Sequence, residues 1–245
     1  MTEGEAGRSA GCGHATALLY AEDSYLREFT ATAIRSGPGY VVLDRTAFYP
    51  ASGGQPSDIG LLSCASKTVR VLKVLKRDRD IFHYIDGPLP EGVVVHGVLD
   101  WDARFFNMRR HSAEHLLSGL FELAGAGPKV YSDMTRLEFK PSDLTEDRVR
   151  RVKAEFNRAV GIDIPIRIYY ASRSEVDVEA DERKRAFLEK IPRSVERLRM
   201  VEIPGYDRTF CFGTHVRSTG EIGRLSKLEL VKGRRRREVL FFELE

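Results

Sequence analysis

The segment Arg109-Arg-His-Ser-Ala-Glu-His-Leu-Leu-Ser-Gly-Leu-Phe-Glu-Leu-Ala124 decides how the second half of the chain folds. Its apolar residues recur at the spacing of one helix face, which predicts an amphipathic helix. At about 100° per residue, His111 and His115 lie roughly 150–170° from the centre of this apolar stripe, so we predict that neither belongs to the hydrophobic core. Two alternatives remain for the pair: an exposed position on a solvated face, or a metal-binding position that faces a cleft.

A second pair of metal-binding side chains lies later in the chain, in Cys211-Phe-Gly-Thr-His215. Imidazole nitrogen and thiolate sulfur are the ligands that zinc prefers. The glycine in this motif predicts a loop or a strand end, which can bring the second pair to the helix. We therefore predict one Zn²⁺ per chain, held by His111, His115, Cys211 and His215.

The rest of the chain divides into two blocks, and together they predict the α+β fold class. Residues 17–99 contain short β-branched runs separated by glycine-containing turns, which predict a small N-terminal β-barrel. Residues 100–245 alternate helices with strands, which predicts an α+β domain of sheet and packed helices. In that domain we expect further helices at 142–160 and 174–189, and strands at 164–170, 198–203, 222–231 and 238–244. Residues 1–16 are expected to form a flexible tail.

One segment of the barrel block, residues 44–60, combines adjacent glycines with hydroxyl and amide side chains. Gly53 and Gly54 let the backbone approach a ligand closely and expose its N–H groups. A simple hairpin loop would explain the two glycines, but it would not explain Thr46 and Gln55 beside them. We therefore treat this segment as part of a functional site.

Charge and composition narrow the class of partner. The net charge of +3, from 39 basic and 36 acidic residues, is too small for a protein that coats DNA. The basic residues nevertheless cluster, at Arg109 and Arg110 and again in the run Arg234, Arg235, Arg236 and Arg237, which suits a partner with a few phosphates. We expect no transmembrane segment and no signal peptide. Three dispersed cysteines suggest a reducing cytoplasm.

Three motifs in this order resemble the editing domain of alanyl-tRNA synthetase and its freestanding relatives, the AlaX alanyl-tRNA editing proteins. They are Leu43-Asp-Arg-Thr-Ala-Phe-Tyr-Pro-Ala-Ser-Gly-Gly-Gln55, Arg110-His-Ser-Ala-Glu-His-Leu-Leu117, and Cys211-Phe-Gly-Thr-His-Val-Arg-Ser-Thr-Gly-Glu-Ile-Gly223. The Gly-Gly-Gln motif on an N-terminal barrel resembles the medium-length AlaX type. Two positions depart from the family pattern. Phe212 stands where relatives usually have Gly, and Ala51 stands where they often have Glu.

The resemblance implies a hydrolase that deacylates mischarged tRNA(Ala), chiefly Ser-tRNA(Ala), at a zinc-containing site, and it leaves open whether Gly-tRNA(Ala) is a second substrate. A synthetase pocket discriminates such similar side chains by only about 10–200-fold, so the wrong ester must be hydrolysed at a second site. Thr46 resembles the family residue that contacts the serine hydroxyl. Gln55 and the amides of Gly53 and Gly54 are candidates for orienting water or stabilising the oxyanion. Ser132 and Asp133 are further candidates for the substrate pocket.

Two other functional classes are compatible with parts of the sequence. His111-x-x-Glu114-His115 matches the H-x-x-E-H pattern of inverted zinc peptidases, in which Glu114 would be the general base. A non-catalytic RNA-binding module with structural zinc is the second alternative. Four protein ligands are the count of a structural zinc site, so the sequence leaves open whether the zinc is catalytic. The sequence makes no prediction of the oligomeric state.

Overall fold

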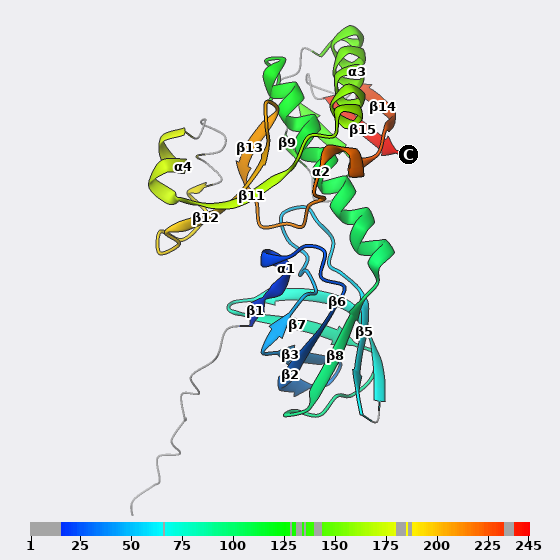
Figure 1. Ribbon diagram of the computed structural model, residues 1–245, viewed down its shortest axis with the longest axis vertical. Coiled ribbons are helices and arrows are strands. Elements are labelled where there is room, and N and C mark those ends of the chain that lie inside the picture. The colour runs from blue at the N-terminus through cyan, green and yellow to red at the C-terminus, as the bar shows by residue number, and fades with distance from the viewer. Residues whose placement is uncertain are drawn as a thin grey trace, which may run out of the picture.

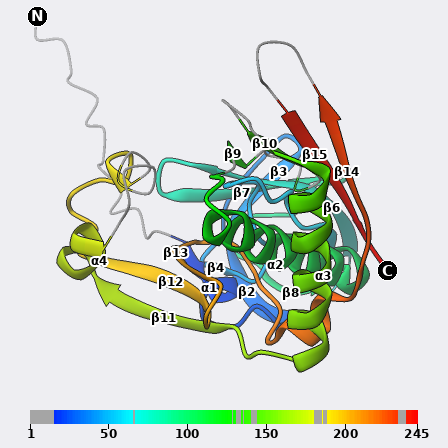
Figure 2. The same ribbon diagram turned by 90° about the horizontal axis from the view of Figure 1, so that it is seen from above.

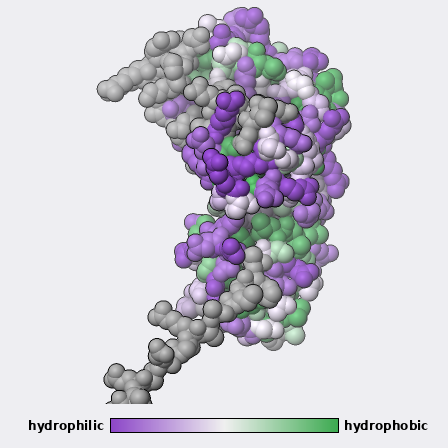
Figure 3. All heavy atoms as spheres, turned by 90° about the vertical axis from the view of Figure 1, so that its left-hand side faces the viewer, coloured by the Kyte–Doolittle hydropathy of each residue, from purple (hydrophilic) through white to green (hydrophobic). Residues whose placement is uncertain are grey.

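The N-terminal strands close into a barrel, and one long helix leads from it into a second lobe (Figure 1). The structure is a computed structural model, which describes residues 16–65, 67–127, 129–130, 134, 136–139, 144–179, 185, 188–232 and 238–245. On the face drawn in Figure 3, hydrophilic side chains dominate the lobe at the top, while hydrophobic ones gather below the constriction between the two lobes. Within the described part of the chain, no helix is both long and apolar enough to cross a membrane.

The barrel has six antiparallel strands in the order β2-β3-β7-β6-β5-β8, which confirms the predicted N-terminal β-barrel. Alternate residues point inward, because side chains of a strand alternate between its two faces; Ile81, His83 and Ile85 of β7 are buried in this way. The strands are β2 Glu28–Gly37, β3 Tyr40–Leu43, β5 Gly60–Cys64, β6 Lys67–Arg77, β7 Asp80–Ile85 and β8 Val94–Leu99. At one end lie helix α1, Leu19–Glu22, and a short parallel pair formed by β1, Ala17–Leu18, and β4, Arg45–Thr46.

Helix α2, Trp101–Leu123, is the predicted metal-motif helix and organises the second lobe. It begins directly after β8, where the Asp100 side chain accepts a hydrogen bond from the backbone N–H of Ala103. Its apolar side packs against helix α3, Glu146–Ile162, in the core of this lobe. Figure 2 shows the two sheets on opposite sides of this helix pair, as expected for an α+β fold.

The two sheets are short and antiparallel. One has the order β14-β15-β10-β9 and the other the order β11-β12-β13. Helix α4, Arg173–Glu179, packs against the second sheet, and the 3₁₀ turn η1, Thr219–Ile222, packs on α2 and α3. The strands are β9 Lys129–Val130, β10 Arg136–Phe139, β11 Arg167–Ser172, β12 Arg197–Ile203, β13 Asp207–Phe210, β14 Leu225–Lys232 and β15 Glu238–Leu244.

Several predicted elements differ from the observed ones at their ends; the strand expected at 164–170, for example, is β11, Arg167–Ser172. The helix expected at 142–160 begins at Glu146, because Thr145 is extended and its side chain caps the N–H of Arg148. The strand expected at 222–231 begins at Leu225, because the residues before it form η1. The helix expected at 174–189 begins as α4, and residues 180–184 lie outside the described part of the chain.

A buried ion pair joins α2 to the barrel. Arg104 has no exposed surface, and its guanidinium donates to the Asp58 carboxylate and to the backbone oxygens of Ser24 and Ala47. Asp58 also accepts the backbone N–H of Tyr49 at 2.6 Å. This one side chain therefore fixes α2, the start of the barrel and the loop between β4 and β5.

Removing the guanidinium should be strongly destabilising. Arg104→Met leaves the Asp58 carboxylate buried without its cation, which typically costs about 3–5 kcal/mol. The matched control is Arg70→Met, which breaks the exposed Arg70–Asp86 pair and should cost about 1 kcal/mol or less. Urea unfolding of both variants measures the difference, and equal losses would show that Arg104 does not join the two lobes energetically.

Candidate metal centre

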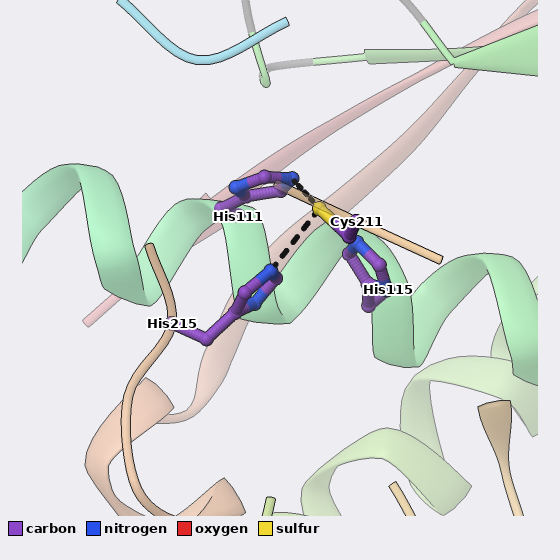
Figure 4. Close-up of side chains that lie close together, drawn as sticks. All are labelled: His111, His115, Cys211 and His215. Carbon is purple, nitrogen blue, oxygen red and sulfur yellow. Dashed lines mark hydrogen bonds between the residues drawn. The ribbon is translucent and has the colours of Figure 1, made fainter. Parts of the chain in front are cut away.

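The two predicted ligand pairs meet in space. His111 and His115 project from α2, and Cys211 and His215 come from the loop after β13 (Figure 4). The Sγ of Cys211 lies 3.5 Å from the Nε2 of His111 and 3.4 Å from the Nε2 of His215, and the four ligand atoms all lie within 4.8 Å of one another. Tetrahedral zinc, with bonds of about 2.0–2.1 Å to nitrogen and about 2.3 Å to sulfur, places N and S about 3.6 Å apart. The cluster therefore has the size of a zinc site.

The ligand loop depends on a glycine and on a buried arginine. A Cβ at Gly213 would lie 2.0 Å from Cε1 of His111, so only glycine lets the loop pass the imidazole ring. Arg199 of β12 is 1% exposed and donates to the backbone oxygens of Cys211, at 2.8 Å, and Gly213, at 2.9 Å. These contacts hold the loop so that the thiol of Cys211 faces the helix.

Each of the three histidines has a second partner at its Nδ1 atom. Gln55 Oε1 lies 2.9 Å from Nδ1 of His111, and the Asp207 carboxylate lies 2.8 Å from Nδ1 of His115. For His215 the partner is the hydroxyl of Ser112, at 3.1 Å. Carboxylate and amide oxygens accept hydrogen bonds, so they favour the tautomer with the proton on Nδ1 and a free lone pair on Nε2. Such partners are typical of histidines that bind metal.

The electrostatics of the cluster favour a thiolate. Burial alone would raise the pKa of the Cys211 thiol, but His111 and His215 outweigh this effect and hold it well below its usual range. Burial, together with His111, lowers the pKa of His215. For His115, burial lowers the pKa, but the hydrogen bond to Asp207 and the contact with Cys211 outweigh it and raise the pKa to about 10. A thiolate beside imidazoles is a donor set for a soft divalent cation.

The two histidines of α2 are less exposed than a solvated face would require. His111 is 3% exposed, and the His115 side chain is 11% exposed. The exposed-pair alternative is therefore wrong. The apolar stripe located one buried side of α2, but the opposite side is covered as well, by polar groups of the ligand loop and by Gln55 of the barrel.

The Gly-Gly-Gln motif forms a tight hairpin. Ser52 and Gln55 exchange both backbone hydrogen bonds, and Gly53 and Gly54 have φ values of 55° and 94°, which glycine adopts without strain. The hairpin presents Gln55 to the centre. Its Oε1 also accepts the N–H of Thr214 at 3.0 Å, and its Nε2 donates to the Thr214 hydroxyl at 2.7 Å. Gln55 thus positions a ligand and the ligand loop, while the catalytic roles predicted for Gln55 and the two glycines stay predictions.

Thr46 lies among the hydrogen bonds of the barrel. Its side chain is fully buried, and its hydroxyl lies 2.8 Å from Nε2 of His83 and accepts the backbone N–H of Phe48. Burial lowers the pKa of His83 to about 4, so the ring is neutral near pH 7. In the structure the Thr46 hydroxyl contacts His83 and the Phe48 N–H, and its predicted contact with a serine hydroxyl stays a prediction.

The arginines predicted to contact RNA have different surroundings in the structure. The guanidinium of Arg109 donates to the backbone oxygens of Ile222 and Glu245, so it braces the end of the chain against α2. The Arg110 guanidinium lies 5.2 Å from the centre of the Phe106 ring. The run 234–237 lies outside the described residues, as do the pocket candidates Ser132 and Asp133.

Sequence reasoning did not identify Ser112, Arg199 and Asp207 as parts of the site. Ser112 lies inside the first motif and one residue from His111, so its position on the helix was a usable signal. Asp207 and Arg199 lie in ordinary strands, and their roles follow only from the tertiary fold. Asp207 comes close because α2 has Gly119 there, where a Cβ would lie 2.1 Å from the Tyr206 carbonyl oxygen.

Comparisons with known proteins agree with this architecture. Residues 16–103 match the family of class II (A) tRNA synthetases, and residues 198–241 match the second additional domain of threonyl and alanyl tRNA synthetases. The alanine–tRNA ligase of Ignicoccus hospitalis is 37% identical over 86% of this chain, which spans only 24% of the ligase.

Two full-length relatives are more informative. The alanyl-tRNA editing protein AlaX-M of Methanosarcina barkeri is 36% identical, and the alignment covers 92% of this chain and 98% of that protein. Its counterpart in Methanosarcina acetivorans is also 36% identical, with 94% and 100% covered. This chain therefore belongs to the AlaX-M family of alanyl-tRNA editing proteins.

Proposed function

We propose that this protein is an aminoacyl-tRNA deacylase that edits mischarged tRNA(Ala), chiefly Ser-tRNA(Ala) and also Gly-tRNA(Ala), in the cytoplasm. Family membership supports the reaction class. The observation that carries the proposal to a site is the cluster of three imidazoles and one thiolate, in which the Nδ1 atom of every imidazole is held by a neighbour.

We propose Zn²⁺ as the cofactor, with one ion per chain. His111, His115, Cys211 and His215 would hold it, and their separations and donor types fit zinc. When bound, zinc supplies a Lewis acid that polarises the ester or a bound water. Gln55 and Asp207 favour the tautomer of His111 and His115 that binds metal, and the Ser112 hydroxyl lies against Nδ1 of His215.

Hydrolysis replaces the bond between the amino acid carbonyl carbon and the ribose oxygen by a bond to water oxygen. One water proton passes to the ribose oxygen, which leaves with the tRNA. Because four protein ligands would form a closed set, we consider two alternatives: one of the four ligands would give way to water, or the ion would shape the pocket and hold the substrate amine. In the second alternative the amides of Gly53 and Gly54 are our candidates for stabilising the oxyanion.

The two other functional classes, an inverted zinc peptidase and a non-catalytic RNA-binding module, have less support. In a peptidase Glu114 would act on water beside the metal, but this side chain is buried, at 2% exposure. The Cys211 ligand and the Gln55 contact would also have no role in such an enzyme. A non-catalytic RNA-binding module would keep the cluster but would turn over no ester.

The function is tested with tRNA(Ala) charged separately with serine, glycine and alanine. We expect the protein to hydrolyse the seryl and glycyl esters, and to hydrolyse the alanyl ester at least roughly tenfold more slowly. A chelator should abolish the reaction, and added Zn²⁺ should restore it. Binding of tRNA without release of any amino acid would instead support the non-catalytic module.

The metal is tested by its content in purified variants. We expect about one zinc per chain in the wild type and a large loss in His111→Ala and Cys211→Ala, because each variant removes one ligand. His96→Ala is the control, since His96 lies on the barrel surface and contacts Glu28. Full zinc retention in both ligand variants, measured by elemental analysis, would contradict the assignment.

Thr46→Val tests the predicted contact with serine. If the hydroxyl recognises serine, the loss of about 1–3 kcal/mol in transition-state binding should fall on the seryl substrate alone. If the hydroxyl only holds His83 and the loop, both substrates should suffer equally and the protein should unfold at lower urea concentration. The buried position of Thr46 favours the second outcome. Thr68→Val, which changes an exposed threonine on β6, is the control.

A further inference from the structure

A groove between α2 and α3, hereafter the α2–α3 groove, is not used by the metal centre. Its cavity volume of about 750 Å³ falls within the range of about 300–1,000 Å³ that is common for ligand sites. Its lining combines apolar residues, of which Leu123 is 67% exposed, with three arginines and one glutamate. We call the apolar residues Leu120, Leu123, Ala124 and Val152 the floor, and the charged residues Arg148, Arg151, Arg158 and Glu155 the rim.

The groove lies directly behind one metal ligand. Tyr206 forms one of its walls, and the next residue, Asp207, holds Nδ1 of His115 at 2.8 Å. Leu123, which also lines the groove, is eight residues beyond His115 on α2, which is about 12 Å along the helix axis and about 80° around it. The nucleotides next to a terminal ester at the centre would therefore extend toward the groove.

The rim of the groove suits phosphate groups. Arg148, Arg151 and Arg158 are spaced by three and then seven residues on α3, so they share one helix face. Arg151 pairs with Asp147, and Arg158 pairs with Glu155 and donates to the Tyr206 hydroxyl. The Arg151–Asp147 pair is exposed, and exposed pairs contribute only about 0–1 kcal/mol, so a phosphate can compete for this guanidinium at little cost. The Arg158–Glu155 pair is bidentate, at 2.7 and 2.5 Å, and is held more firmly.

We propose that the α2–α3 groove binds the acceptor end of the tRNA substrate. The arginines would contact backbone phosphates next to the terminal nucleotide, and the apolar floor would contact a ribose or base. This assignment rests on the proposed function, because only an RNA ester at the centre places phosphates beside the groove. Guanidinium groups bind phosphate through paired hydrogen bonds, which suits this partner better than an uncharged one.

The test compares two substrates and two double variants of the full chain. Arg148→Gln/Arg151→Gln removes two charges from the groove, and Arg35→Gln/Arg70→Gln removes two charges from aspartate-paired arginines on the barrel. The substrates are Ser-tRNA(Ala) and 3′-O-seryl-adenosine, which has the ester but no phosphate. Zinc content and unfolding are measured for all proteins to confirm that the centre is intact.

We expect the groove variant to lose roughly tenfold in kcat/KM on Ser-tRNA(Ala), mainly through KM, and to keep wild-type activity on seryl-adenosine. The slope of log affinity for tRNA against log salt should become shallower by about 0.7–0.9 for each phosphate that the variant no longer neutralises. The barrel variant should match the wild type on both substrates.

Equal activity and equal salt slope in the groove variant and the wild type would overturn the assignment, and would leave a protein partner as the occupant to test. Losses of equal size on both substrates would also overturn it, because they would mean that the arginines support the centre itself. If the wild type hydrolyses neither ester, the proposed function fails, and filter binding of tRNA still decides whether the groove binds RNA.

Discussion

The architecture depends on the buried contact between Arg104 and Asp58. Both side chains are almost fully inaccessible, at 0% and 1% exposure, and the removal of two charges from water is costly unless every hydrogen bond is made. Here the guanidinium also satisfies two backbone oxygens, and the carboxylate also accepts the Tyr49 N–H. A buried pair with so many fixed partners permits one orientation of α2 on the barrel. That orientation places the hairpin of residues 52–55 against His111.

The candidate metal centre is consequently formed by both lobes. The candidate ligands come from α2 and from the loop after β13. Gln55 of the barrel orients His111 and makes two hydrogen bonds with Thr214 of the ligand loop. Arg199 adds a second link, because its Nε donates to the Ala21 oxygen while the rest of its guanidinium holds the ligand loop. A change in how the lobes pack would therefore alter the imidazole of His111 and the thiolate of Cys211 together.

Sequence patterns predicted the parts of this arrangement that are encoded locally. Turn-separated β-branched runs predicted the barrel, the apolar spacing in 109–124 predicted α2, and the ligand types predicted which four residues cluster. Two findings depended on tertiary contacts instead. The spacing of apolar residues indicates one buried side of α2, whereas the helix is covered on two sides. Asp207 reaches His115 only because Gly119 lets a distant turn approach the helix, and nothing near Asp207 in the sequence indicates that contact.

The donor set also bears on how the centre can act. Three imidazoles and one thiolate would leave a bound divalent cation with net positive charge, whereas a four-cysteine set would make the centre negative. In this buried setting such a charge would act more strongly than in water. Asp207 would partly oppose it, but through His115 rather than by direct ligation. With a cation bound, the cluster would combine the ligand count of a structural site with the charge that polarisation of an ester requires.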